Sequence, residues 1–405
     1  MKHLILLLTF VFPALFSAQH AEIKPYVNFL KTQNTSAKDY LISLFDRYDI
    51  VIFAERMHNE QTQYELLLDV FQDPRLREKS GHIFVEMGGS NFDKPINDFL
   101  HSKNLTEDES RKKAIEIQRN STWYPLWDSY NYHYLLTGLY KINSTLPAKS
   151  KISLHPTDMA VDWNKILTKE DVTKNIRNRE SMVGRDSVMA ANITSKIKEL
   201  EAKGEKRRKY FVILNSAHSL KHDFGVMGFT VKPAGAKIFE NFPGRVANVL
   251  LNMEAVPDLQ STSNFSALQP VLDGKWDAAF HYVKKDDLGF DLAKSPIADS
   301  LYQNMPLVDK TVKNAQAYTG YVYYRHYPNF MEITGFDGLL DDTYNEELYR
   351  RRTIFYGPAT VSKAEVFNWF NDNFGRKNSV TSQFITDYWP KVMQWKEVKE
   401  EKKAK

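Results

Sequence analysis

Four short apolar runs in this chain each end in an acidic residue or a histidine. The runs and the polar residues that follow them are 49–54 with Glu55 and His58, 82–85 with Glu86, 151–154 with His155 and Asp158, and 210–214 with His218. Short runs rich in β-branched and aromatic residues, bounded by turn residues, are typical of buried strands. The pattern therefore predicts four strands with polar residues at the same end.

The segments between these runs are long enough to carry helices. This spacing predicts an α/β fold with a central, mostly parallel sheet flanked by helices. Apolar patterns predict helices at 37–47, 60–71, 94–118, 130–143, 171–202 and 364–374, and further strands at 246–252 and within 318–336. Ligands of such sheets bind at the carboxyl ends of the strands, where the Glu, Asp and His residues fall. We therefore expect an active or binding site at this edge.

The N-terminus has the pattern of a cleavable signal peptide. Lys2 and His3 precede an apolar stretch over residues 4–16, and small residues follow before residue 19. This predicts a signal peptide over residues 1–18 and a secreted or periplasmic mature chain. The apolar stretch is short for a membrane helix, and no later segment approaches the roughly 20 apolar residues of a span, so no membrane span is expected. The chain has no cysteine, which excludes disulfides and thiol chemistry.

Residues 19–405 are predicted to form a single α/β domain, because no repeat or low-complexity linker divides them. The signals weaken over residues 253–405, and we expect irregular structure or lid-like loops around the site at 257–314. The net charge is +4, and the basic run at 206–209 is typical of solvated surface, which disfavours nucleic-acid binding. The 13% aromatic content fits a core and also a pocket for a bulky small molecule.

Glu55 and His58 are three residues apart in a predicted loop between strand and helix, so both can face one pocket. A histidine is the usual general base for activating water, and an adjacent carboxylate orients it. The chain lacks a Gly-x-Ser-x-Gly elbow, a His-Glu-x-x-His zinc helix, a Walker loop and a dinucleotide fingerprint. What remains is water activated by histidine and carboxylates, either directly or through a metal.

Five pieces of sequence occur in an order that resembles the erythromycin esterase family. They are Ala-Glu-Arg-Met-His at 54–58, Val-Glu at 85–86, Asp158, Arg-Asp-Ser-Val-Met-Ala-Ala-Asn at 185–192, and Asn-Ser-Ala-His at 215–218. The wider relatives are the ChaN-like haem-binding proteins and the TraB/Tiki group. The resemblance spans roughly residues 40–255, and the motif at 185–192 is its most specific piece.

The resemblance implies an α/β fold whose pocket hydrolyses an ester or lactone without a metal or other cofactor. It assigns His58 as the base, Glu55 and Glu86 as residues that orient it or position the water, His218 as a catalytic group, and Arg185 and Asp158 as substrate-binding residues. Arg185 and His218 would bind substrate or stabilise the oxyanion. Ala54 replaces the glycine of the family, and Asn59-Glu60 replaces a Gly-Thr pair, so the small-molecule substrate is left open.

Two other functions fit the same residues. Glu55, His58, Glu86 and His218 could bind a divalent metal, as the Tiki-like relatives suggest, and such ligands suit zinc, manganese or cobalt. Alternatively, the protein could bind haem or another bulky ligand without catalysis. In that case Tyr321, Tyr323, Tyr324 or His326 would hold the ligand, although alternate tyrosines also pack in ordinary cores.

Overall fold

The computed structural model describes residues 21–122, 130–177, 182–226, 228–255, 269–374 and 383–395. The predicted signal peptide at residues 1–18 lies outside the described residues, and secretion therefore stays a prediction.

A seven-stranded sheet forms the centre of the molecule, in the order β3-β2-β4-β1-β7-β9-β8. Its strands are β1 Ile50–Glu55, β2 Ser80–Gly89, β3 Ser153–Asp158, β4 Lys209–Asn215, β7 Val246–Leu251, β8 Asp287–Asp291 and β9 Gly320–Tyr324. Every neighbouring pair is parallel except β8 and β9, which are antiparallel. A separate hairpin pairs β5 Phe224–Val226 with β6 Phe229–Val231. The predicted α/β class and mostly parallel sheet are confirmed.

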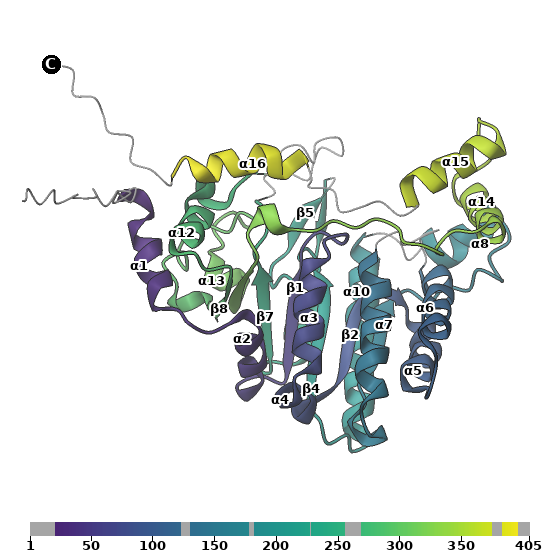
Figure 1. The fold of residues 1–405 in the computed structure, drawn as a ribbon, viewed down its shortest axis with the longest axis horizontal. Coiled ribbons are helices and arrows are strands. Elements are labelled where there is room, and N and C mark those ends of the chain that lie inside the picture. Colours follow the sequence, from purple (N-terminus) through teal and green to yellow (C-terminus); the bar gives the residue numbers. More distant parts are fainter. Residues whose placement is uncertain are drawn as a thin grey trace, which may run out of the picture.

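Helices cover both faces of the sheet (Figure 1). They are α1 Lys24–Thr32, α2 Ala37–Ser43, α3 Thr62–Gln72, α4 Pro74–Lys79, α5 Asp93–His101, α6 Glu107–Ser121, α7 Tyr130–Ser144, α8 Lys169–Val172, α10 Met182–Ala202, α11 Ala234–Asn241, α12 Lys275–Val283, α13 Asn314–Ala317, α14 Asp342–Tyr356, α15 Lys363–Phe374 and α16 Gln383–Met393. Side chains alternate along β1, so Val51 and Phe53 pack towards α2, α3 and α7. Ile50 and Ile52 pack on the other face, towards α10 and α11.

The helical region predicted at 94–118 consists of two helices. Residues 102–106 separate α5 from α6. Thr106 starts α6 with a capping box, in which its hydroxyl accepts from the amide of Glu109 and the Glu109 carboxylate accepts from the amide of Thr106. The helix predicted at 171–202 is also divided, into α8, a π-helical turn at Thr173–Arg177 and α10.

The prediction of irregular structure or lid-like loops at 257–314 is wrong for part of that region. Helix α12 and strand β8 lie within 257–314, and β8 forms the far edge of the sheet instead of a lid. The sequence pattern missed β8 because this strand has five residues, with aspartates at both ends and Gly289 in the middle. A Cβ at Gly289 would lie 2.4 Å from the Cβ of Tyr40, so the glycine is required for close packing of α2. The single-domain assignment of 19–405 stays a prediction.

The chain between β9 and α14 crosses the edge at which β1 and β2 end, and we call residues 330–336 the strap (Figure 1). It is hydrogen-bonded to the loop that follows β1. The amide of Gln61 donates to the carbonyl of Met331 at 2.6 Å, and the amide of Ile333 donates to the carbonyl of Asn59 at 3.0 Å. The loop that carries His58 is therefore tied to a segment from the last third of the chain.

No helix among the described residues is both long enough and apolar enough to cross a membrane.

Candidate active site

The register of the sheet brings the predicted polar residues to one edge. Glu55 at the end of β1 pairs with Asn215 at the end of β4. Glu86 follows Val85 of β2, which pairs with Ile213 of β4, and Asp158 ends the neighbouring strand β3. Parallel strands end on the same side, so these side chains gather in one region as the sequence predicts.

Glu55 and His58 form a hydrogen-bonded pair. The Nδ1 atom of His58 lies 3.1 Å from Oε2 of Glu55. The other carboxylate oxygen of Glu55 accepts from the Tyr64 hydroxyl at 2.7 Å and from the Asn131 amide at 3.2 Å. Tyr64 comes from α3 and Asn131 from α7, and both side chains are buried. Glu55 is therefore held from two helices, and it directs the imidazole through Nδ1.

The surroundings of His58 make it a stronger base than an ordinary histidine. Burial lowers its pKa, but the charge and hydrogen bond of Glu55, together with the charge of Glu86, outweigh this effect and raise the pKa above its usual value. The Glu55 side chain is 1% exposed, whereas that of His58 is 36% exposed. The pair thus joins a buried carboxylate to an imidazole that reaches solvent.

Arg185 of α10 lies between two carboxylates. Its Nη2 atom donates to Oε1 of Glu86 at 2.8 Å, and its Nε and Nη2 atoms donate to Oδ2 of Asp158 at 3.1 and 2.9 Å. Burial raises the pKa of Glu86, but the positive charges of His218, Arg185 and His58 outweigh it and hold the pKa far below its usual value. Glu86 therefore stays ionised and fixes Arg185 instead of carrying a proton.

His218 is held at both ring nitrogens by consecutive residues of α10. Its Nδ1 atom lies 2.9 Å from Oδ1 of Asp186, and Nη1 of Arg185 lies 3.1 Å from its Nε2 atom. The same Asp186 oxygen accepts from the amide of Ala234 at 2.7 Å. Burial lowers the pKa of His218, but the charges of Glu86 and Asp186 outweigh this and raise it. Arg185 and Asp186 of the sequence motif thus fix the position of this histidine from both sides of its ring.

The four residues proposed as metal ligands do not fit a metal site. The Arg185 guanidinium contacts both Glu86 and His218, and so a cation already lies where a metal would have to bind. The oxygens of Glu55 are bonded to Tyr64, Asn131 and His58. In the described part of the chain, no group of three or more His, Asp or Glu residues could hold a metal ion.

The tyrosines of β9 do not fit a haem site either. Tyr323 stacks on Phe280 with ring centroids 3.7 Å apart, and Tyr321 packs against Phe290 at 5.6 Å. His326 contacts the hydroxyl of Tyr323 at 3.1 Å, while Tyr324 points to the opposite face of the sheet and packs there. The alternating pattern therefore reflects packing on the two faces of a strand.

Two other histidines lie apart from this network. The Nε2 atom of the half-buried His222 lies 3.3 Å from the carbonyl oxygen of Gln316. His155 contacts His82 at 2.9 Å and Asp93 at 2.5 Å instead of the residues around Arg185. Sequence reasoning missed Tyr64 and Asn131, because each is one of many polar or aromatic residues on a helix. The one available signal was that both helices border the predicted site.

Substitution of Tyr64 by phenylalanine is expected to raise the pKa of His58 further. The ring still fills its place, but Glu55 loses a donor, so more of its charge acts on the imidazole. We expect a rise of about half a unit, measured by NMR titration of the His58 ring. Tyr344→Phe is the control, since it removes another buried hydroxyl, which donates to the backbone carbonyl of Arg119. An unchanged or lower His58 pKa in Tyr64→Phe would contradict this role.

Comparisons with known proteins gave distant matches among solved structures. No protein-family model and no curated protein matches the sequence. Among solved structures, a mutant of erythromycin esterase EreC in its open conformation matches 80% of this chain and 98% of its own length, with 12% identity and a TM-score of 0.46. A succinoglycan biosynthesis protein matches 76% of this chain and 98% of its own, with 12% identity and a TM-score of 0.44.

A further solved structure, of a Bacillus cereus protein, matches 75% of this chain and 97% of its own, with 13% identity and a TM-score of 0.42. The chain is thus structurally similar to erythromycin esterase at distant sequence identity.

Proposed function

We propose that the protein is a hydrolase in which His58 activates water for attack on an ester or lactone carbonyl. The observation that carries the proposal is the pairing of buried Glu55 with a solvent-reaching His58. A histidine oriented by a carboxylate is the usual arrangement for taking a proton from water. The motifs at 54–58 and 185–192 support the same reaction.

The reaction follows from the hydrogen bonds of the site. Glu55 accepts from Nδ1 of His58, so the Nε2 atom takes a proton from water while the water oxygen bonds to the carbonyl carbon. The carbonyl oxygen becomes an oxyanion, which the guanidinium of Arg185 stabilises while His218 accepts from Nη1 of Arg185 and helps to hold it. The bond from carbon to the alkoxy oxygen then breaks, and His58 returns the proton to that oxygen. Glu86 and Asp158 hold Arg185 in place throughout.

The proposed setting is the periplasm or the exterior of the cell, acting on a small molecule. The basic, apolar and small-residue segments of residues 1–18 support export.

The pH dependence of hydrolysis tests the proposed base. His58 must be neutral to accept a proton, and its pKa is raised, so kcat/KM is expected to rise with pH and to reach half its maximum above about pH 6.5. The measurement uses a panel of esters and lactones between pH 5 and 9, with a chelator present. Hydrolysis that falls as pH rises through this range would contradict the proposal. So would the absence of hydrolysis across the panel.

A further inference from the structure

A groove of about 840 Å³ lies between α7 and the loop that joins α5 to α6. Tyr130, Tyr134 and Lys141 line one side of it, at helical spacing along a single face of α7. These positions span about 17 Å, because an α-helix rises 1.5 Å per residue. None of the residues proposed for hydrolysis lines the groove, which makes it a separate, elongated site.

The walls of the groove are fixed by packing. The Tyr140 hydroxyl of α7 accepts from the amide of Leu105 at 2.9 Å, which holds the α5–α6 loop against the helix. Asn104 in this loop has a left-handed backbone with φ of 58°, a conformation that asparagine tolerates. Leu68 of α3 also lines the groove and packs directly on Gly138, where a Cβ would lie 2.3 Å from it. The shape of the groove is therefore built into the fold.

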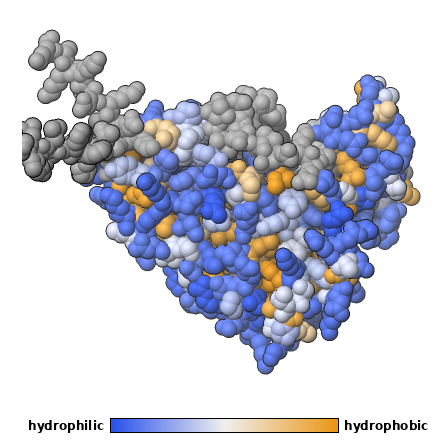
Figure 2. All heavy atoms as spheres, viewed as in Figure 1, coloured by the Kyte–Doolittle hydropathy of each residue, from blue (hydrophilic) through white to orange (hydrophobic). Residues whose placement is uncertain are grey.

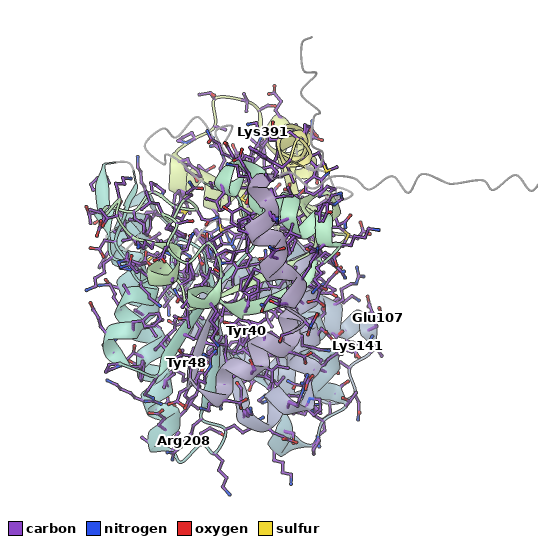
Figure 3. All side chains as sticks on the ribbon, turned by 90° about the vertical axis from the view of Figure 1, so that its left-hand side faces the viewer. Tyr40, Tyr48, Glu107, Lys141, Arg208 and Lys391 are labelled. Atoms are coloured by element: carbon purple, nitrogen blue, oxygen red, sulfur yellow. The ribbon has the colours of Figure 1, made fainter. Side chains whose placement is uncertain are left out.

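The groove carries an excess of positive charge. Lys103, Lys141 and Lys151 line it, and Glu107 is the one acid among its described lining residues. Figure 3 shows Glu107 and Lys141 on the same side of the molecule. Within the described ranges, no carboxylate forms an ion pair with Lys103 or Lys141, whereas Arg111, Lys112 and Arg119 of the neighbouring helix α6 each pair with an aspartate. These cations are thus available to an anion.

Lys151 shows that the positive charges act on each other. Its ammonium donates to the carbonyl of His101 at 3.0 Å. Burial lowers its pKa, and the charge of Lys103 lowers it further. An anionic ligand would relieve this repulsion.

We propose that this groove binds an anionic oligosaccharide. The half-buried rings of Tyr130 and Tyr134 provide flat apolar faces for sugar rings, with polar tips at the rim. Side chains of Ser102, Asn104 and Thr137 provide partners for hydroxyl groups. The lysines bind carboxylate or sulfate groups. Figure 2 shows the face that carries α3 and α7 as largely hydrophilic, with hydrophobic side chains in its lower centre. Such a face suits a ligand that has both polar groups and apolar ring faces.

The test is fluorescence anisotropy of a labelled heparin-derived tetrasaccharide with the full chain. Saturable binding is expected, with no binding of neutral maltotetraose and at least about tenfold weaker binding of a polyphosphate of equal charge. Lys103→Gln combined with Lys141→Gln is expected to weaken binding by at least about tenfold, and so is Tyr134→Ala. Both lysines are exposed, so the double variant should fold normally.

The matched control is Lys206→Gln combined with Arg208→Gln, which removes the same charge from a basic run elsewhere. Figure 3 labels Arg208 far from Lys141. The control should bind within about twofold of the unchanged protein, because long-range charge effects are screened by salt. Equal weakening in the control, equal binding of polyphosphate, or no binding of the tetrasaccharide would each overturn the proposal.

Discussion

Replacement of His58 by glutamine is expected to lower kcat for ester or lactone hydrolysis by about 10²- to 10⁴-fold, the usual contribution of a general base. Glutamine is similar in size to histidine and keeps a hydrogen-bonding group, so Glu55 keeps a partner. The loop that carries the residue therefore keeps its shape. It cannot take a proton from water near neutral pH. The loss should therefore appear in kcat, with KM changed little. Initial rates over a range of substrate concentrations provide the measurement.

The matched control for this experiment is His222→Gln, a substitution in a half-buried histidine outside the Arg185 network. Its hydrolysis rate should equal that of the unchanged protein. Thermal unfolding of both variants separates loss of the base from loss of the fold. A His58→Gln protein that folds normally and hydrolyses every accepted substrate at the original rate would rule out His58 as the base.

Replacement of Arg185 by methionine is expected to destabilise the protein by about 3–5 kcal/mol at pH 8, the usual cost of breaking a buried ion pair. Arg185 is the direct partner of both Glu86 and Asp158, and its side chain is 14% exposed. Without the guanidinium, two carboxylates of low exposure lose their cation. His218 loses the donor at its Nε2 atom in the same step. Urea unfolding gives the free energy of unfolding.

The pH dependence of this loss follows from Glu86. Its pKa is lowered in the folded protein, so its ionised form adds stability above the ordinary pKa near 4.5, and this stability is lost as pH falls below that value. In Arg185→Met the pKa of Glu86 rises and the group becomes protonated more readily. The difference from the unchanged protein should therefore be smaller at pH 5 than at pH 8. A difference that grows towards pH 5 would contradict this reasoning.

The control for Arg185 is Arg47→Met, which removes a half-exposed arginine paired with Asp291. Exposed pairs contribute about 0–1 kcal/mol, so its free energy of unfolding should change by no more than that amount.

The central strands and the edge that carries the site were predictable because their signal is local. The buried strand Ile50–Glu55 is apolar at every position before Glu55, and the carboxylate at its end stands out against that background. Strand β8 and helix α12 lack such contrast. Gly289 serves packing against Tyr40, and this requirement is visible only when α2 lies on the sheet. Short edge elements therefore depend on tertiary contacts that a linear pattern does not contain.

The same distinction applies within the site. Glu55, His58 and Arg185 belong to motifs and were predictable, and the structure brings them to one edge. The partners Tyr64 and Asn131 were not predictable, since α3 also presents other polar side chains and α7 presents four tyrosines and a second asparagine. Which of them contacts Glu55 depends on how each helix is rotated against β1. The role of Asp186 was not predictable either, because it depends on the position of His218 between Asp186 and Arg185.

The strap determines when the loop that carries His58 can form all its hydrogen bonds during synthesis. Residues 59–61 are hydrogen-bonded to residues 331–333, about 270 positions later in the chain. Ribosomes add about 5–20 residues per second, so these partners emerge roughly a quarter of a minute to a minute apart. A nascent chain contains Glu55 and His58 early, but the hydrogen bonds that close their loop cannot form until the last third has been made. The proposed catalytic pair, Glu55 and His58, is thus translated early but reaches its final surroundings only after the strap has been made.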